Sequence, residues 1–304
     1  MFLQLKPGDI IDVIAPSSAH HDVSLESIEK FVSNLGYRAR IRKGLIVKDA
    51  DIFSANKNEV RFTHLLEALL AEDSKVIWAF RGGYGATRIL SQLDNHDFSK
   101  QRKFLIGFSD ITALFLYFHA RYKWPYIHGR VLSQYASTEV KEEEVGCIKK
   151  ILSGNSKTIR YSFEPVNKKA CVPKKINAEI IGGNLSLIQC SLGTTWQINS
   201  NNKVLFIEET NERGYKIHRM LEHLKQAGVF DNIKALILGN IDCLAEPNGS
   251  SLCEAAISNF FDGVTFPVIR SKNFGHGENN YPLMMGTKSL LTLGKDVYLT
   301  FENS

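Results

Sequence analysis

The chain has 304 residues, 44% of them hydrophobic and 23% charged, which is the composition of an ordinary globular protein long enough for two domains. It contains no run of about eighteen apolar residues and no basic stretch before a long apolar core near its start, which argues against a transmembrane helix and a signal peptide. A net charge of +5 spread along the chain suits an anionic small substrate and does not indicate nucleic-acid binding.

The cysteines and histidines do not form a recognisable metal or disulfide pattern. The five cysteines include no C-x-x-C pair: Cys147, Cys171, Cys190, Cys243 and Cys253. An odd number without close pairs argues against a disulfide framework or a zinc knuckle and predicts a reducing, cytoplasmic setting. None of the nine histidines has a zinc-ligand spacing such as H-E-x-x-H. We therefore expect no metal and no other cofactor.

Apolar strands and helices alternate in the first half of the chain. The predicted elements are a strand at 9–15, helices at 23–35 and 59–71, a strand at 76–80, a helix to residue 93, and a strand at 104–106 followed by a helix from residue 111. Strands separated by helices of this length indicate βαβ units and a largely parallel sheet. Residues 1–152 are therefore interpreted as an N-terminal, doubly wound α/β domain.

The second half has a different character. Residues 153–177 carry paired lysines, two prolines and no sustained helical period, so we interpret them as the connection between domains. Residues 178–304 form a second predicted domain with strands at 178–181, 204–207 and 235–238, helices at 185–192 and 215–227, and a β-hairpin over 290–301.

The turn after the strand at 104–106 has the features of a nucleophile elbow. An abrupt strand-to-helix turn exposes the side chain at its apex, here Ser109, beside backbone N–H groups at the helix start that have no intrahelical partner. Ile111 stands where the usual G-x-S-x-G pattern has its last glycine. The alternative is that Ser109 or Asp110 only caps the helix.

A glycine-rich turn follows the neighbouring strand. Residues 81–85, Arg-Gly-Gly-Tyr-Gly, connect a strand to a helix, and their amides could hold an anion or supply an oxyanion donor. The turn lacks both G-x-G-x-x-G and the G-K-[ST] ending of a P-loop, which argues against a nucleotide site. The alternative is a tight turn that needs glycine for positive φ.

An acid and a histidine in the second half are candidates for general acid–base chemistry. Glu208 ends an apolar strand, where sites form in parallel sheets, although Glu209 and Glu212 are rivals. His276 lies between two glycines in a loop, and His119 and His128 are alternatives that could line a pocket or be structural. The order Ser109, Glu208, His276 matches the serine, acid, histidine order of α/β-hydrolases.

Several segments together resemble the signature blocks of the LD-carboxypeptidases. This serine peptidase family includes muramoyltetrapeptide carboxypeptidases and microcin C immunity peptidases. The blocks occur in family order and cover most of the chain: 80–85, 106–114, 181–185, 205–209 with 215–221, and 274–277.

The resemblance implies a fold and a set of residue roles. It implies an N-terminal parallel α/β domain bearing the nucleophile, a C-terminal β-barrel-like domain bearing the acid and base, a site between them, and a homodimer. Ser109 would be the nucleophile, His276 the base and Glu208 its orienting acid. Amides of Asp110 and Gly83 would form the oxyanion hole. Many relatives have aspartate where this chain has Glu209, which leaves Glu208 or Glu209 open as the acid.

Weaker expectations concern the substrate. Gly182, Gly183 and Asn184 match a family block expected near the substrate, and Arg81 and Arg130 are candidates to bind a terminal carboxylate. The resemblance implies release of D-alanine from recycled murein tetrapeptides. An immunity-type peptidase acting on peptidyl-nucleotides is the alternative, for which Trp124, Trp196 or Tyr84 could stack on a base. A non-catalytic small-ligand-binding protein on the same scaffold is a third hypothesis.

Overall fold

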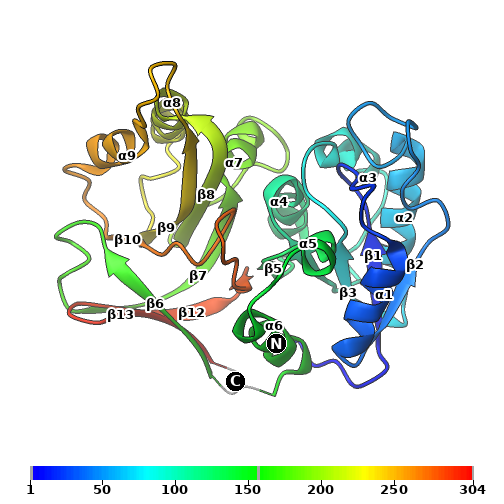
Figure 1. Cartoon of the computed structure of the whole chain (residues 1–304). Coiled ribbons are helices and arrows are strands. Elements are labelled where there is room, and N and C mark those ends of the chain that lie inside the picture. The colour runs from blue at the N-terminus through cyan, green and yellow to red at the C-terminus, as the bar shows by residue number, and fades with distance from the viewer. Residues whose placement is uncertain (1–2, 156–157, 303–304) are drawn as a thin grey trace. The chain divides into compact units, whose positions relative to one another are not determined.

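The computed structural model describes residues 3–155 and 158–302, which divide into two compact units. Unit 1 comprises residues up to 155 together with 281–283, and unit 2 comprises residues from 156 to 280 and from 284 onward. Figure 1 shows the elements of each unit. Among the described residues, no helix is long and apolar enough to cross a membrane.

Unit 1 is built on a six-stranded sheet in the order β11-β5-β4-β3-β1-β2. Strands β1 to β5 pair in parallel, as the alternating strand and helix pattern predicts. Central strands are apolar on both faces, with Val13 and Ile77 fully buried. The strands are β1 (Ile10–Ile14), β2 (Arg38–Ile41), β3 (Ser74–Ala79), β4 (Phe104–Gly107), β5 (Tyr126–His128) and β11 (Leu283–Met285).

Unit 1 also contains α-helices among its described residues. They are α1 (Leu25–Asn34), α2 (Asn58–Leu70), α3 (Leu90–Leu93), α4 (Thr112–Tyr122), α5 (Leu132–Ser137) and α6 (Glu142–Ser153). Ser24 caps α1, since its hydroxyl accepts the backbone N–H of Ser27 at 3.1 Å. Helix α4 is buried on all sides from Thr112 to His119, which is why its sequence is almost uniformly apolar. That burial fixes the position of the turn preceding it.

Unit 2 is a closed barrel in the order β10-β6-β13-β12-β7-β8-β9. Strands β7, β8, β9 and β10 run parallel, and the remaining pairs are antiparallel, including the predicted hairpin of β12 and β13. The strands are β6 (Thr158–Pro165), β7 (Lys174–Asn184), β8 (Val204–Arg213), β9 (Ala235–Leu244), β10 (Val268–Arg270), β12 (Lys288–Leu293) and β13 (Val297–Glu302). Helices α7 (Leu185–Ser191), α8 (Gly214–Gln226) and α9 (Cys253–Phe261) accompany them.

The stretch 153–177 differs from its interpretation as a connection between domains. It contains β6, which pairs with β13 and β10, and the beginning of β7, which pairs with β12. Ile159, Tyr161 and Phe163 alternate with polar residues along β6, the pattern of a half-buried strand. A search for helical period overlooks this two-residue alternation.

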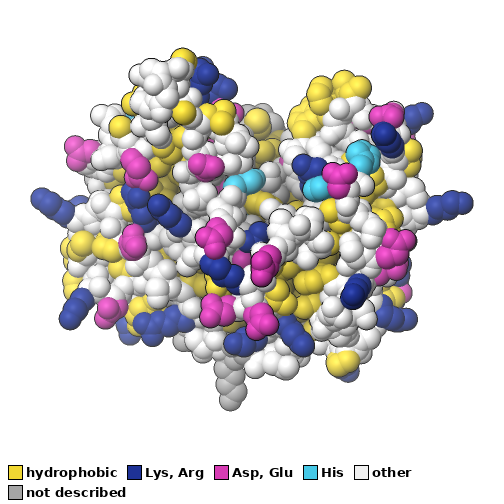
Figure 2. All heavy atoms as spheres, in the orientation of Figure 1, with side chains coloured by type: hydrophobic (Ala, Val, Ile, Leu, Met, Phe, Trp, Pro, Cys, Tyr) yellow, Lys and Arg dark blue, Asp and Glu magenta, His cyan; other side chains and the backbone are white. Residues whose placement is uncertain are grey.

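The face of the molecule drawn in Figure 2 carries positive, negative and hydrophobic side chains intermixed. No stripe of one charge dominates that face, in keeping with the modest net charge of +5. A polyanion-binding surface would show a concentration of lysine and arginine.

Candidate active site

The turn that joins β4 to α4 has the strained geometry of a nucleophile elbow. Phe108 is extended with φ −163°, and Ser109 adopts the left-handed region with φ 60°, which costs a non-glycine residue about 1–3 kcal/mol. Ser109 is half-buried between the buried residues Phe108 and Asp110. A Cβ on Gly82 would lie 2.9 Å from Cβ of Ser109, so glycine lets the next loop approach the serine.

Hydrogen bonds hold the loop after β3 beside this elbow. Gly83 has φ 100°, a conformation that favours glycine. Ser18, in the loop that follows β1, contacts the same segment: its N–H donates to the carbonyl of Gly82 at 3.1 Å, and its hydroxyl accepts the N–H of Tyr84 at 3.0 Å. The segments that follow three neighbouring strands therefore meet around Ser109 in unit 1.

The carboxylate of Asp110 is part of that assembly. It is buried and accepts the Ser17 hydroxyl at 2.6 Å and the N–H of Ala86 at 2.8 Å. Burial raises the pKa of Asp110, and these hydrogen bonds work in the opposite direction by stabilising the charged form.

Glu208 and His276 form an acid–histidine pair in unit 2. Oε2 of Glu208 lies 2.5 Å from Nδ1 of His276, and the Glu208 side chain is completely buried whereas that of His276 is 18% exposed. Burial alone would lower the pKa of His276, but the negative charge and hydrogen bond of Glu208 outweigh it, so the net shift is upward. This contact fixes the ring and leaves Nε2 as the nitrogen that can exchange protons with a substrate.

Two glycines make the room that this pair needs. A Cβ on Gly275 would lie 2.8 Å from Cβ of Glu208, and one on Gly239 would lie 3.0 Å from the same atom. Asn280 holds the loop in place, since its Oδ1 accepts the N–H of Gly275 at 2.9 Å. Gly239 and Asn280 belong to no sequence motif, and their roles depend on chain segments that meet only in the fold.

Glu209 has a different role from Glu208. Successive residues of a strand point to opposite sides. The Glu209 carboxylate accepts the amide of Asn184 at 3.0 Å, and the N–H and hydroxyl of Ser186 at 2.7 Å and 2.6 Å. Burial raises its pKa in spite of these bonds. It therefore ties β8 to the start of α7.

The Gly182-Gly183-Asn184 segment lies against β8 in the barrel. A Cβ on Gly182, whose φ is 141°, would overlap the carbonyl of Phe206, so close strand packing requires the glycine. Asn184 is buried and caps α7 by accepting the N–H of Leu187 at 3.2 Å, in addition to its bond to Glu209. These two hydrogen bonds of Asn184 join β8 and α7.

The two arginines proposed for carboxylate binding differ. Arg130 is buried and paired with the fully buried Glu144, with Nε 2.5 Å from Oε1. This pairing argues against a substrate-binding role for Arg130. Arg81 is only partly buried and donates to the carbonyl of Ala19. The alternative histidines, His119 and His128, are both buried in unit 1.

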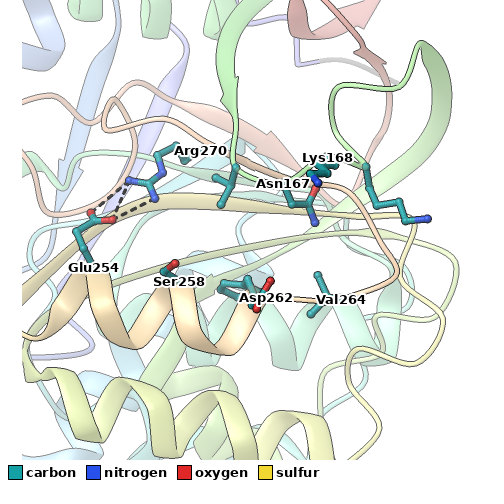
Figure 3. A pocket seen from close by; sticks show the side chains of 11 residues that line it. Asn167, Lys168, Glu254, Ser258, Asp262, Val264 and Arg270 are labelled. Carbon is teal, nitrogen blue, oxygen red and sulfur yellow. Dashed lines mark hydrogen bonds and ion pairs between the residues drawn. The ribbon is translucent and has the colours of Figure 1, made fainter.

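A separate cavity of about 750 Å³ lies in unit 2 between α9, β10 and the loop after β6 (Figure 3). Arg270 on its wall forms an ion pair with Glu254, with Nη1 3.1 Å from Oε2. Neither Glu208 nor His276 lines it, so it is distinct from the acid–histidine pair. Within residues 3–155 and 158–302, no group of three or more potential metal ligands occurs.

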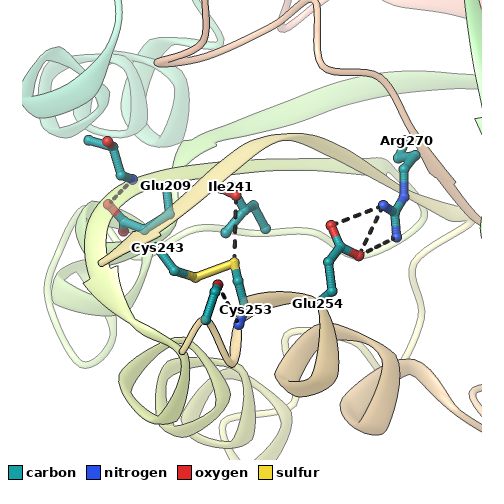
Figure 4. The surroundings of a disulfide bond; sticks show 8 residues. Glu209, Ile241, Cys243, Cys253, Glu254 and Arg270 are labelled. Atoms are coloured by element: carbon teal, nitrogen blue, oxygen red, sulfur yellow. Dashed lines mark hydrogen bonds and ion pairs between the residues drawn. A yellow bond between two sulfur atoms is a disulfide. The ribbon is translucent and has the colours of Figure 1, made fainter. Parts of the chain in front are cut away.

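The cysteines depart from the expectation in one respect. Cys243 at the end of β9 and Cys253 at the start of α9 form a disulfide across ten residues (Figure 4). Their spacing in the sequence does not indicate it, because the pairing depends on how the 244–252 loop returns to the strand.

The sequence-predicted site residues thus form two groups. Ser109, Asp110 and Gly83 come together in unit 1, and Glu208 and His276 come together in unit 2.

Comparisons with known proteins match both halves of the chain. The LD-carboxypeptidase N-terminal domain model matches residues 11–129, and the C-terminal domain model matches residues 177–291. A putative carboxypeptidase of Rickettsia conorii is 32% identical over 95% of this chain and 90% of its own length. A probable murein peptide carboxypeptidase of Bacillus subtilis is 28% identical over 94% and 90%. The microcin C7 self-immunity protein MccF of Escherichia coli is 24% identical over 85% and 82%.

The fold has a close counterpart among solved structures. The muramoyltetrapeptide carboxypeptidase from Oxalobacter formigenes superposes with a TM-score of 0.80 at 24% identity, covering 97% of this chain and 99% of that one. This likeness supports the α/β architecture of a parallel sheet with a closed barrel.

Proposed function

The chain belongs to the LD-carboxypeptidase family of serine peptidases, and we propose that it releases terminal D-alanine from murein tetrapeptides in the cytoplasm. The observation that carries the chemical part of the proposal is the Glu208–His276 contact of 2.5 Å, together with the elbow at Ser109. The murein peptide carboxypeptidase of B. subtilis, similar over nearly the whole chain, supports the choice of substrate.

In the first half-reaction Ser109 is the nucleophile. Neutral His276 accepts the proton of the Ser109 hydroxyl as Oγ forms a bond to the carbonyl carbon that precedes D-alanine. The carbonyl oxygen becomes an oxyanion, which the amides of Asp110 and Gly83 stabilise. Glu208 stabilises the imidazolium that His276 becomes. This step requires the two units to bring Ser109 Oγ within hydrogen-bond reach of His276.

Collapse of the tetrahedral intermediate completes the first half-reaction. The imidazolium of His276 donates its proton to the departing nitrogen as the C–N bond breaks, D-alanine leaves, and the acyl-enzyme remains to be hydrolysed in the second half-reaction. Water then gives a proton to His276 while its oxygen attacks the ester carbon. Cleavage of the ester returns the proton to Ser109 and releases a tripeptide with a new carboxylate.

Arg81 is the better of the two arginine candidates for the terminal carboxylate of the substrate. It is only partly buried and follows β3 directly beside the Gly82–Gly83 turn, whereas Arg130 is held by Glu144. Gly182, Gly183 and Asn184 remain proposed neighbours of the substrate, and a homodimer remains a prediction from the family resemblance.

An immunity-type activity on peptidyl-nucleotides is the second candidate, favoured by the likeness to MccF. Of the three aromatic residues considered for stacking on a base, Trp124 and Trp196 are buried. Tyr84 is 48% exposed and directly follows Gly83. Of these three residues, Tyr84 is therefore the candidate for stacking on a base.

The test compares wild type with Ser109→Ala on a murein tetrapeptide that ends in D-alanine. We expect release of D-alanine by wild type and its near-total loss in the variant. Equal release by both proteins would remove Ser109 from the mechanism. If wild type released no D-alanine but cleaved an aminoacyl sulfamoyl nucleoside, the immunity-type activity would replace the murein proposal.

A further inference from the structure

We propose that the carboxylate of Asp110 is a positioning group that sets the spacing between the two oxyanion donors. The inference rests on the proposed function, in which the amides of Asp110 and Gly83 face the oxyanion. Asp110 carries one of these amides in its own backbone. Its side chain reaches across to the loop that carries the other amide, and so a single residue links both donors.

The contacts of Asp110 join the segments that follow three strands. The Ser17 hydroxyl, from the loop that follows β1, donates to Oδ2 at 2.6 Å, and the N–H of Ala86, at the end of the glycine-rich loop after β3, donates to the same oxygen at 2.8 Å. Asp110 itself follows β4. The Asp110 side chain is 2% exposed, so water does not substitute for these donors.

A buried arginine holds the same loop from its other side. Nη1 of Arg61 donates to the carbonyl of Gly85 at 3.0 Å and to that of Pro16, and Nη2 donates to Oδ1 of Asn58 at 2.6 Å. The peptide between Gly85 and Ala86 is therefore held at its N–H by Asp110 and at its C=O by Arg61. Gly83 lies two residues before Gly85, so the position of its amide depends on these contacts of Asp110 and Arg61.

The burial cost of the carboxylate is consistent with a functional role. A buried carboxylate is costly unless its hydrogen bonds are satisfied, and the carboxylate of Asp110 bonds to Ser17 and Ala86 and does not cap the helix. The positive charge of Arg61 favours the ionised form of Asp110. An asparagine would be nearly the same size, but its neutral amide accepts weaker hydrogen bonds and presents an NH₂ group to surrounding N–H donors.

The experiment measures Asp110→Asn beside wild type, Ser17→Ala and Asp12→Asn. Asp12 is a fully buried carboxylate on β1 that bonds to Arg40 at 2.7 Å and does not touch the elbow, so Asp12→Asn reports the cost of losing a buried charge alone. For each protein we would determine kcat and KM for D-alanine release, the thermal midpoint, and the rate at which a fluorophosphonate labels Ser109. Labelling forms an Oγ–P bond and expels fluoride, with the serine proton passing to His276, and its transition state also uses the oxyanion donors.

The expected result is a kcat roughly ten- to a hundred-fold lower in Asp110→Asn with KM within about twofold of wild type, and labelling slowed in parallel. Ser17→Ala should show a smaller decrease of the same kind, and it carries the test if Asp110→Asn does not fold. Asp12→Asn should lower the thermal midpoint and leave kcat unchanged at temperatures where it is folded.

Folded Asp110→Asn with wild-type kcat and labelling would overturn the inference. The inference would also be overturned if kcat decreased in proportion to the decrease in thermal midpoint, and by the same proportion in Asp110→Asn and Asp12→Asn. If wild type releases no D-alanine but is labelled at Ser109, the proposed substrate fails while the labelling rates still test Asp110. If wild type is not labelled at Ser109, both the nucleophile and the positioning role are wrong.

Discussion

Glu208 and His276 are 68 positions apart in the sequence, and their side chains meet at 2.5 Å inside one unit. The carboxylate comes from the middle of β8 and the imidazole from a loop that follows β10. The contact can form because Gly239 and Gly275 have no side chains to obstruct Glu208. The pair therefore lies entirely within unit 2. The upward shift of the His276 pKa that Glu208 causes also arises within that unit.

The upward shift of the His276 pKa predicts the direction of a pH effect. His276 must be neutral to accept the serine proton, so kcat/KM should fall as pH decreases through a pKa that lies above the ordinary value for histidine. Glu208→Gln removes the negative charge that favours the imidazolium, so the pKa should decrease and the acidic limb should move to lower pH. The maximal kcat should also decrease, by roughly a hundredfold or more, because the imidazolium formed in the reaction loses its counter-charge.

The measurement is the pH dependence of kcat/KM for both proteins. Glu254→Gln is the matched control, because Glu254 is an acid of the same unit that pairs with Arg270 and is absent from the neighbours that shift His276. An acidic limb that stays in place in Glu208→Gln would show that His276 is not the base or that Glu208 does not control it.

Glu209→Ala should change the free energy of unfolding more than it changes the pKa of His276. The substitution leaves the amide of Asn184 and the N–H of Ser186 without their buried acceptor, which costs about 1–3 kcal/mol for such groups. Because burial raises the pKa of Glu209, its ionised form is disfavoured in the fold, and the penalty of replacing it should decrease as pH rises above the ordinary value for glutamate. Urea unfolding of both proteins at several pH values checks this. A stability equal to wild type throughout would contradict the structural role.

The sequence predicts much of this architecture, and its failures have physical causes. Local patterns reveal the parallel strands and the elbow at Ser109, because strand period, glycine and helix start are all local signals. The choice between Glu208 and Glu209 depends on which side of β8 faces the loop of His276, and no local pattern contains that information. Strand β6 falls within the stretch interpreted as a connection because that stretch carries paired lysines, prolines and no sustained helical period. Only Phe163 is buried along this strand.

The arginine prediction shows the same limit. Arg130 follows a strand end, as Arg81 does, and only the fold shows that it pairs with Glu144 of α6. Arg130→Met should therefore destabilise the protein by about 3–5 kcal/mol, because it leaves a buried carboxylate without its counter-charge. The double variant Arg130→Met with Glu144→Leu should recover most of that loss. Chemical denaturation provides the comparison. A stable Arg130→Met protein with a much higher KM would instead restore Arg130 as a substrate-binding residue.

Gly275→Ala tests whether the close approach of the loop to Glu208 is required. The new Cβ would lie 2.8 Å from Cβ and 2.9 Å from Oε2 of Glu208, so either the loop or the carboxylate must move. Either movement separates Glu208 from His276, and kcat should decrease by roughly a hundredfold or more. The measurement is kcat together with the pH profile, which should shift in the same direction as that of Glu208→Gln.

Gly263→Ala is the matched control for the cost of the backbone conformation. Gly263 also has positive φ, 75° compared with 105° at Gly275, but a Cβ there would have no heavy atom within 4 Å. Both variants should therefore lose about 1 kcal/mol of stability from the unfavourable φ. Only Gly275→Ala should lose activity and shift the acidic limb. Equal activity in the two variants would mean that the loop tolerates a methyl group and that the Glu208–His276 spacing does not depend on Gly275.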